Sequence, residues 1–253
     1  MRDIETPVIA PGAPASEADI AQVAAAIGDA SRAKVLLALA DGRAMPATAL
    51  AAEAGVSAST ISGHLTRLRA AKLLTVEHDG RHRYYRLAST DVARALEELA
   101  RIAQPLQVRS LRDSARVRAL MRARLCYDHL AGRLGVTLLD ALVDRGVLGH
   151  CDGGYAITGD GFGELAAFGI DAAEFSRRRP AVRYCVDWAE RRHHLAGALG
   201  AAVTGRLFAL DWLRHGRSRR VVTLTEAGET GLHEAFGLRR DWAGTASEAA
   251  GKR

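Results

Sequence analysis

Residues 46–74 carry the sequence PATALAAEAGVSASTISGHLTRLRAAKLL, which contains the clearest structural pattern in the first part of the chain. A proline opens a short helix predicted over 47–54, and Gly55 supplies the left-handed residue that turns the chain. Ser57 is the expected cap of a second helix that runs to about residue 71, with three residues facing inward: Ile61, Leu65 and Leu68. Two helices joined by a short turn that contains glycine form a helix-turn-helix.

Two extended stretches follow this pair of helices, over 74–78 and 83–87. The turn Asp79-Gly80 lies between them and is a strong hairpin signal, so the sequence predicts a wing. The next helix is expected over 91–104, where an apolar stripe is formed by Val92, Leu96 and Leu99. Such a stripe predicts a surface that joins two copies of the chain.

Several motifs follow one another in order: Ile27-Gly28-Asp29-Ala30-Ser31-Arg32, Leu50-Ala51 through Gly55-Val56-Ser57, Ser59 through Leu65, Leu68 through Leu74, and Gly80-Arg81 through Tyr84-Tyr85-Arg86-Leu87. Together they resemble the ArsR/SmtB family of winged-helix repressors, over residues ~18–104. The resemblance implies a homodimer that pairs through its terminal helices. Sensors of this family often place metal ligands on the first helix of the helix-turn-helix or on the dimer helix. Here 47–54 contains no Cys or His and 91–104 contains no His, so the resemblance carries no metal ligand onto this chain.

The second helix of the helix-turn-helix and the wing supply the candidate contacts to double-stranded DNA. Small hydroxyl residues let a helix approach the floor of the major groove, and basic residues neutralise phosphates. A capped surface helix with solvated charges is the alternative interpretation. The candidates are Ser57, Ser59, Thr60, Ser62, His64, Arg67, Lys72, Arg81 and Arg83.

The second half of the chain contains an internal repeat. The stretch HLAGRLG at 129–135 returns as HLAGALG at 194–200, and Cys-x-Asp precedes both copies. The repeats, at ~125–171 and ~184–238, are each expected to form helix, helix, strand, turn and helix. The sequence therefore predicts a mainly α fold with small β-wings, in which a winged helix-turn-helix precedes two winged-helix-like repeats. The expected domains are a disordered arm at 1–15, a DNA-binding and dimerisation domain at 16–104, and an effector-sensing domain at 105–253.

The repeats also carry a candidate effector site. Thiolate and imidazole groups from two related lobes suit a tetrahedral soft-metal site, but they suit a small-molecule or thiol-reactive pocket as well. The remaining interpretation is structural, with buried cysteines in the core and aspartates that cap helices. Arginines at 183, 191 and 192 are expected to lower the pKa of a nearby thiol. The candidates are Cys126, Asp128, His129, Cys185, Asp187 and His194, with His193 beside them, and the metal is left unknown.

Composition limits the class of protein. The 253 residues are 48% hydrophobic, which is typical of a globular chain, and the modest net charge of +6 fits a polyanionic partner. Three cysteines argue against a disulfide framework, and no apolar run suits a membrane span, so we expect a cytoplasmic protein. Enzyme motifs are not found, and we expect no catalytic residues. The function indicated is a repressor released by an effector. The alternatives are a constitutive protein-interaction module in the second half, or a metal- or thiol-responsive sensor that uses Cys126 and Cys185.

Overall fold

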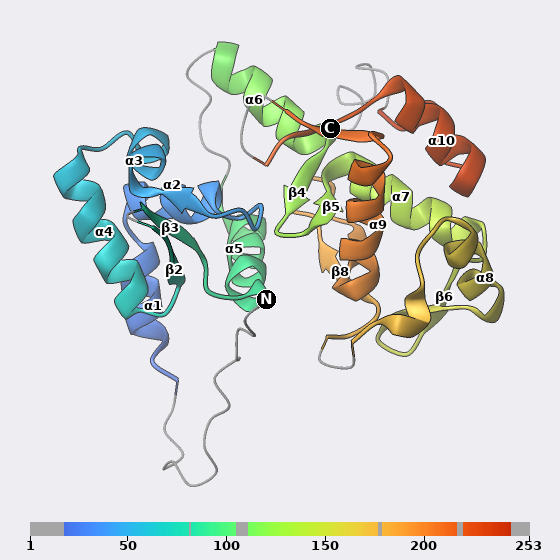
Figure 1. Cartoon of the computed structure of the whole chain (residues 1–253), viewed down its shortest axis with the longest axis horizontal. Coiled ribbons are helices and arrows are strands. Elements are labelled where there is room, and N and C mark those ends of the chain that lie inside the picture. The colour runs from blue at the N-terminus through green and yellow to red at the C-terminus, as the bar shows by residue number, and fades with distance from the viewer. Residues whose placement is uncertain (1–17, 81, 105–110, 177–178, 217–219, 244–253) are drawn as a thin grey trace, which may run out of the picture. The chain divides into compact units, whose positions relative to one another are not determined.

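The computed structural model describes residues 18–80, 82–104, 111–176, 179–216 and 220–243 (Figure 1), so the predicted arm at 1–15 lies outside the described residues. The chain divides into two compact units, Met1–Ala93 and Arg94–Arg253. The division falls inside helix α5 (Thr90–Ile102), whereas the sequence suggested a boundary after Gln104. No helix among the described residues has the length and apolar character that crossing a bilayer requires.

The first unit is a winged helix-turn-helix. Gly55 ends α3 with φ +72° and Ser57 caps α4, so both local signals in the sequence are confirmed. Asp29 caps α2, because its carboxylate accepts hydrogen bonds from the backbone N–H groups of Ser31 and Arg32. The helices are α1 (Ile20–Ile27), α2 (Ala30–Ala38), α3 (Ala47–Ala54) and α4 (Ala58–Ala70).

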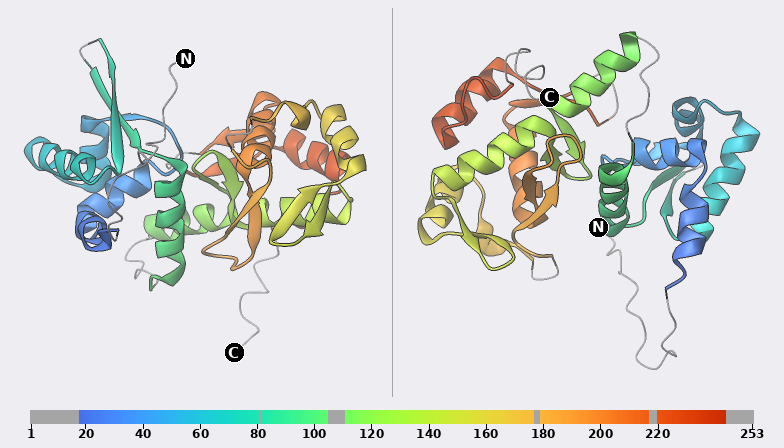
Figure 2. Two further views of the ribbon diagram at one scale, coloured as in Figure 1. Left: turned by 90° about the horizontal axis from the view of Figure 1, so that it is seen from below. Right: turned by 180° about the vertical axis from the view of Figure 1, so that it is seen from behind.

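A three-stranded antiparallel sheet completes this unit, in the order β1-β3-β2. Strands β2 (Leu74–Asp79) and β3 (His82–Leu87) pair along their whole length, with Leu74 opposite Leu87, while β1 (Met45–Pro46) pairs with the other edge of β3. Figure 2 shows β2 and β3 as a long hairpin that extends away from the helices, which is the predicted wing. The residues that face inward from α4, Ile61, Leu65 and Leu68, are buried as expected.

The second unit contains the duplication, and each copy has the order hairpin, helix, hairpin, helix. After α6 (Leu111–Arg122), the first copy comprises β4 (Arg124–Cys126), β5 (His129–Ala131), α7 (Gly132–Asp144), β6 (Leu148–Cys151), β7 (Gly154–Ile157) and α8 (Gly159–Ala167). A short 3-10 helix, η1 (Ala172–Glu174), separates it from the second copy. The second copy comprises β8 (Arg183–Val186), β9 (His193–Ala196), α9 (Gly197–Ala209), β10 (Leu213–His215), β11 (Val222–Leu224) and α10 (Glu226–Phe236).

The start of each repeat differs from the expected helix. Residues 126–129 form a hairpin with a two-residue turn, in which Cys126 lies directly opposite His129 and Tyr127 has φ +61°. In the second copy Cys185 lies opposite His194. The later part of each copy, a helix followed by a short hairpin and a second helix, matches the expected order.

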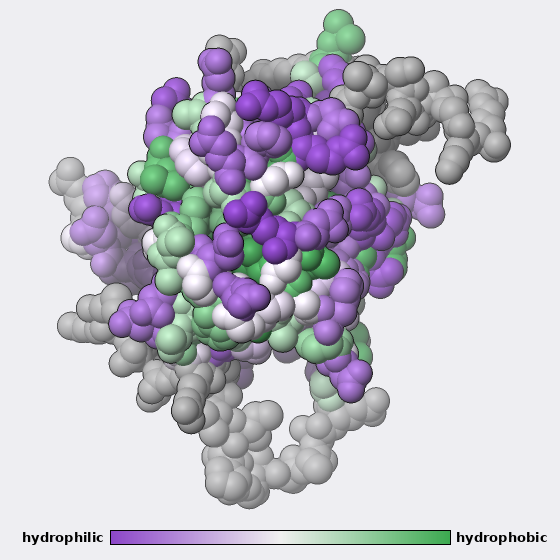
Figure 3. Space-filling view, turned by 90° about the vertical axis from the view of Figure 1, so that its right-hand side faces the viewer, coloured by the Kyte–Doolittle hydropathy of each residue, from purple (hydrophilic) through white to green (hydrophobic). Residues whose placement is uncertain are grey.

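The two copies share one hydrophobic core. Leucine and valine side chains of α7 and α9 pack together in it, and they include Leu134, Leu138, Leu142, Leu199, Val203 and Leu207. The hairpins β4-β5 and β8-β9 lie beside these two helices in Figures 1 and 2. Figure 3 shows one outer face of the chain, where hydrophilic side chains alternate with smaller apolar areas. The shared core fixes the two hairpins next to each other.

Candidate functional site

The outward face of α4 carries most of the predicted DNA contacts. Ser59, Thr60, Ser62 and Arg67 are exposed along the helix. Ser57 is exposed but its hydroxyl is engaged, because it accepts from the backbone N–H of Thr60 at 3.2 Å and lies 2.9 Å from the hydroxyl of Ser59. The hydroxyl groups therefore form a small polar surface at the N-terminal end of α4, where a recognition helix presents its contacts.

His64 does not belong to this outward face. Its side chain is only 15% exposed, and Nε2 lies 3.9 Å from Oδ1 of Asp29, the residue that caps α2. The expected exposure of His64 is therefore wrong, and its contact with DNA stays a prediction. The imidazole instead joins α4 to the start of α2.

The wing and the end of α4 present basic residues to solvent. Lys72 and Arg83 are both exposed, and Arg83 lies opposite His78 in the wing. Arg81 lies outside the described residues. Arg86 is held by Glu77 at 3.0 Å, so its charge is already balanced within the wing.

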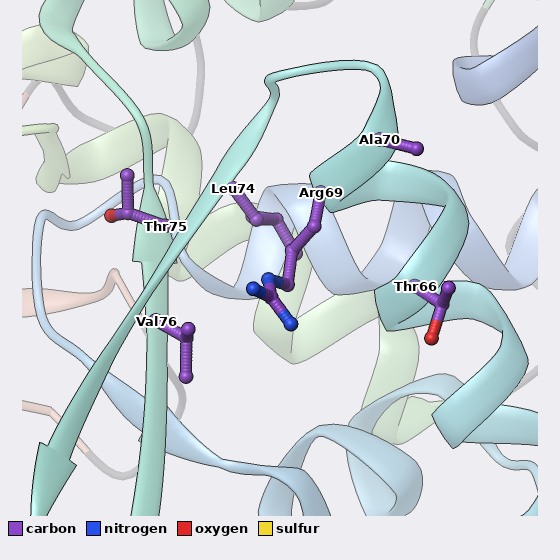
Figure 4. A pocket seen from close by; sticks show the side chains of 6 residues that line it. All are labelled: Thr66, Arg69, Ala70, Leu74, Thr75 and Val76. Atoms are coloured by element: carbon purple, nitrogen blue, oxygen red, sulfur yellow. The ribbon is translucent and has the colours of Figure 1, made fainter.

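A hollow of about 540 Å³ lies between α4 and β2, lined by Thr66, Arg69, Ala70, Leu74, Thr75 and Val76. Figure 4 shows the guanidinium of Arg69 extending across it. Arg69 is an exposed basic residue next to the other candidate phosphate contacts, and sequence reasoning missed it. The signal was available, since Arg67, Arg69 and Lys72 are closely spaced at the end of the predicted helix.

Four of the predicted effector residues meet in one cluster in the second unit: Cys126, His129, Cys185 and His194. One sulfur or nitrogen atom from each residue lies within 4.8 Å of every other. Three of these residues are buried and Cys185 is half-buried. Each repeat contributes one Cys and one His that face each other across its hairpin, and the imidazoles of the two repeats stack with their centroids 5.3 Å apart.

Two glycines hold the histidines in place across the repeats. A Cβ added to Gly200 of α9 would lie 3.2 Å from Cβ of His129, and one added to Gly135 of α7 would lie 3.5 Å from Cβ of His194. The same Cβ atoms would lie 2.9 Å and 2.5 Å from the carbonyl oxygens of Leu195 and Leu130. The repeated HLAG-x-LG stretch thus supplies both a histidine and the glycine against which the histidine of the other repeat packs.

The two predicted aspartates lie behind the histidines rather than among the clustered atoms. Oδ1 of Asp128 lies 3.2 Å from Nδ1 of His129, and Oδ2 of Asp187 lies 3.7 Å from Nδ1 of His194. Arg179 fixes Asp128 with two hydrogen bonds, at 2.6 and 3.1 Å. The fully buried Asp187 accepts the backbone N–H of Gly132 at 2.7 Å.

The pKa values in the cluster follow from these contacts. The hydrogen bond between the two thiols, together with burial, raises the pKa of Cys126 to about 11, and the same bond lowers the pKa of Cys185. Burial lowers the pKa of His129, but Cys126 and Asp128 outweigh burial and raise this pKa to about 9. Burial likewise raises the pKa of Asp128, while His129 and Arg179 bring it down to about 2. Cys185 is therefore the thiol that loses its proton more readily.

Of the three flanking arginines, Arg183 lowers the pKa of Cys185 as expected, whereas Arg191 and Arg192 make other contacts. The pKa of Cys185 is lowered first by Cys126, and Arg183 adds only a lesser effect in the same direction. Arg191 donates to the carbonyl oxygen of Arg101, and Arg192 pairs with Asp140 at 2.8 Å. These two side chains are therefore engaged elsewhere.

Two further titratable residues lie outside the cluster. His193 points away from it, since Nδ1 lies 3.0 Å from the hydroxyl of Tyr155 and the ring stacks on Tyr184. Cys151 is an exposed residue at the end of β6. Neither residue belongs to the four that the structure brings together.

A buried charge network connects the cluster to α5. Arg124 is fully buried and its guanidinium lies 3.0 Å from Asp187 and 3.2 Å from Glu97 of α5. Arg220 also pairs with Glu97, and burial of that carboxyl is outweighed by Arg220 and Arg124, which lower its pKa. No pattern in the sequence indicated this network. Contacts therefore run from His194 through Asp187 and Arg124 to Glu97, all within the second unit.

The chain is similar in sequence to known transcription regulators. A helix-turn-helix domain family matches residues 27–77. The chain is 39% identical over 222 residues to the HTH-type transcriptional regulator YdfF of Bacillus subtilis, which covers 87% of this chain and 98% of the relative. It is 38% identical over 86 residues to the HTH-type transcriptional regulator CmtR of Mycobacterium tuberculosis, covering 34% of this chain and 72% of the relative. The solved structure of the cadmium sensor CmtR from that organism is 35% identical over 36% of this chain and all of its own length, with a TM-score of 0.29.

Proposed function

Because the chain belongs to the ArsR/SmtB family of winged helix-turn-helix transcription regulators, we propose that it is a sequence-specific repressor released from its operator by an effector bound in the second unit. The observation that carries the proposal is the exposed face of α4, with Ser59, Ser62 and Arg67, beside the basic residues of the wing. Hydroxyl groups on α4 contact base edges, and Arg69, Lys72 and Arg83 contact phosphates.

The DNA-binding proposal is tested with an operator selected from a random duplex library by the purified full chain. Ser59→Ala should change the preference at one base pair by roughly 1–3 kcal/mol. Arg83→Ala should weaken binding to all sequences alike and make the salt dependence shallower by about one unit of log–log slope. Arg214→Ala is the control, because this exposed arginine of the second unit pairs with Asp211. Equal losses from all three variants would contradict the assignment.

Repression itself is tested by transcription in vitro from a promoter that overlaps the selected operator. The full chain should lower the amount of transcript, and Ser59→Ala should need a higher protein concentration for the same effect. An increase in transcript would identify an activator and would contradict the repressor assignment.

The proposal includes a homodimer that pairs through α5, as the family resemblance implies. Leu96, expected on the dimer surface, is buried within its own chain. The exposed apolar side chains on α5 are Leu99 and Ile102, at 43% and 68% exposed. Leu99→Glu should therefore yield monomers in sedimentation velocity, whereas Leu37→Glu, at a 40% exposed leucine of α2, should leave the dimer intact. A dimeric Leu99→Glu variant would place the interface elsewhere.

The cluster of Cys126, His129, Cys185 and His194 is the proposed effector site. It is the place in the second unit where thiol and imidazole groups from both repeats meet. A ligand bound there changes the position of His194 and thereby that of Asp187. Asp187 contacts Arg124, which in turn contacts Glu97 of α5. An effector shifts DNA affinity only as far as it binds the two states of the protein differently. The network gives α5 a direct physical link to that difference.

A further inference from the structure

The chemistry of the clustered atoms narrows the class of effector. Two sulfur and two nitrogen atoms converge, from Cys126, Cys185, His129 and His194. Thiolate and imidazole are the ligands that Zn²⁺ and its thiophilic relatives prefer, whereas Mg²⁺ and Ca²⁺ require oxygen ligands. Two Cys and two His form one of the standard tetrahedral ligand sets for zinc.

The histidines show that packing alone does not explain the cluster. Nε2 of His129 and both ring nitrogens of His194 are buried with no hydrogen-bond partner among the described residues. A buried polar atom left without a partner costs about 1–3 kcal/mol, so native proteins contain few of them. His194 is fully buried, and its orphan nitrogens belong to a residue of the four-membered cluster. A bound cation would take the lone pair of one nitrogen from each ring.

The aspartates are placed as supports for metal-bound histidines. A histidine that binds a metal through one nitrogen usually donates the N–H of the other to a carboxylate, which fixes the ring and its tautomer. Asp128 lies at hydrogen-bond distance from Nδ1 of His129, 3.2 Å, whereas Asp187 lies 3.7 Å from Nδ1 of His194, so a small rotation of that ring on metal binding completes the second hydrogen bond. In both residues Nε2 then remains as the ligand atom. The carboxylates are themselves held, Asp128 by Arg179 and Asp187 by Arg124.

The spacing of the ligand atoms suits a cation. Metal–sulfur bonds of about 2.3 Å and metal–nitrogen bonds of about 2.0–2.1 Å in a tetrahedron put ligand atoms roughly 3.3–3.8 Å apart. The clustered atoms lie within 4.8 Å of one another, so side-chain rotations that bring the most distant atoms about 1 Å closer complete the geometry.

We propose that Cys126, His129, Cys185 and His194 bind one thiophilic divalent cation of the Zn²⁺ class in tetrahedral geometry, with Asp128 and Asp187 orienting the two imidazoles. This names the ligand of the proposed effector site, and only its effect on transcription rests on the proposed function. All four positions are taken by the protein, as in metal sites that stabilise a conformation rather than catalyse a reaction. The cation joins the two repeats, so its binding free energy acts on their packing.

The test is a Co²⁺ titration of the full chain after removal of metals with a chelator under reducing conditions. We expect one Co²⁺ per chain, sulfur-to-metal charge-transfer absorption, the intense visible bands of a tetrahedral site, and displacement of Co²⁺ by Zn²⁺. Cys185→Ser should reduce the charge-transfer intensity. It should also weaken Co²⁺ binding by more than the about 10–100-fold expected when a supporting carboxylate is removed. Asp187→Asn should lose about 10–100-fold while retaining the tetrahedral spectrum.

Two neighbouring residues supply matched controls. His193→Gln changes the histidine next to His194 that instead bonds to Tyr155, and Cys151→Ser removes the exposed thiol. Both variants should bind Co²⁺ as the wild type does. Circular dichroism of each variant in chelator checks folding, and native mass spectrometry of the wild type counts the metal without any substitution. No bound metal, a spectrum without sulfur charge transfer, or a disulfide between Cys126 and Cys185 under these conditions would overturn the proposal.

Operator binding separates this inference from the proposed function. Affinity for the selected operator is measured with metal-free and Zn²⁺-loaded protein. A tetrahedral Co²⁺ site with unchanged operator affinity keeps the metal site and refutes its role as effector. Operator binding without any metal site keeps the DNA-binding function and refutes the metal inference.

Discussion

Glu97 and Glu98 are adjacent on α5 but differ in environment, and this difference predicts very different effects of the same substitution. The carboxylate of Glu97, 4% exposed, is shared by Arg124 and Arg220, whose side chains are 0% and 9% exposed. Glu98 pairs with Arg101 at 2.9 Å where both side chains are 40% or more exposed. Replacing each by alanine changes helix propensity equally, so only the charge environment differs.

The expected magnitudes follow from burial. Removing one partner of a buried ion pair costs about 3–5 kcal/mol, because the remaining charge stays in a poorly solvated place. In Glu97→Ala, Arg124 still has Asp187 as a partner at 3.0 Å. The expected loss of stability is therefore that of one broken buried ion pair, although Glu97 contacts two arginines. The exposed pair is worth about 0–1 kcal/mol, so Glu98→Ala should be close to neutral.

Urea unfolding followed by tryptophan fluorescence measures this difference in the second unit. All three tryptophans of the chain, Trp188, Trp212 and Trp242, lie in that unit. The free energy of unfolding is extrapolated to water, with equal m-values as the check that both variants unfold over the same surface. A loss of less than about 1 kcal/mol in Glu97→Ala, or equal losses in both variants, would refute the assignment of Glu97 to a buried network.

Three further predictions follow from described contacts. Gly200→Ala should destabilise the second unit by about 1–3 kcal/mol in the same urea assay and weaken Co²⁺ binding, because the added Cβ meets Leu195 and His129. Gly205→Ala in the same helix places its Cβ in open space and should stabilise the unit by up to about 1 kcal/mol. The pKa of Glu97 is lowered in the folded chain, so the carboxylate stabilises the fold above its unfolded pKa of about 4.3, and this stabilisation is lost as the pH falls from there through the folded pKa. In Glu97→Gln the free energy of unfolding should therefore fall less steeply as the pH is lowered through this range. Arg69→Ala should weaken operator binding at low salt in a fluorescence anisotropy titration, whereas an unchanged affinity would show that the hollow beside β2 lies off the DNA surface.

The winged helix was predictable because its signals are local. Gly55, Ser57 and the Asp79-Gly80 turn each specify a backbone conformation through their own chemistry, and the structure places a helix end, a cap and a hairpin at them. The exposure of His64 was not predictable, since its position on α4 is equally compatible with solvent and with Asp29 of a neighbouring helix.

The second unit was predictable in its duplication but not in its first elements. The turn at Tyr127-Asp128 lacks glycine, and Tyr127 takes a positive φ that sequence rules reserve mainly for Gly and Asn, so a helix was expected where a hairpin forms. Four of the six candidates for the effector site lie together in the structure, and their role as an effector site stays a prediction. The arrangement of the six was not predictable, because only the paired strands show that Cys and His face each other while the aspartates stand behind the imidazoles.

The division of the cluster between the two hairpins has a consequence for how such a site arises. Each repeat holds one Cys and one His, together with the glycine that accommodates the histidine of the other repeat. A protein with a single repeat would therefore carry half of this four-residue cluster and complete it only by pairing with an identical copy about a two-fold axis. Joining the copies in one chain removes the dependence on concentration and lets the halves diverge. Arg179 now secures one histidine through Asp128, while Arg124 connects the other, through Asp187, to α5.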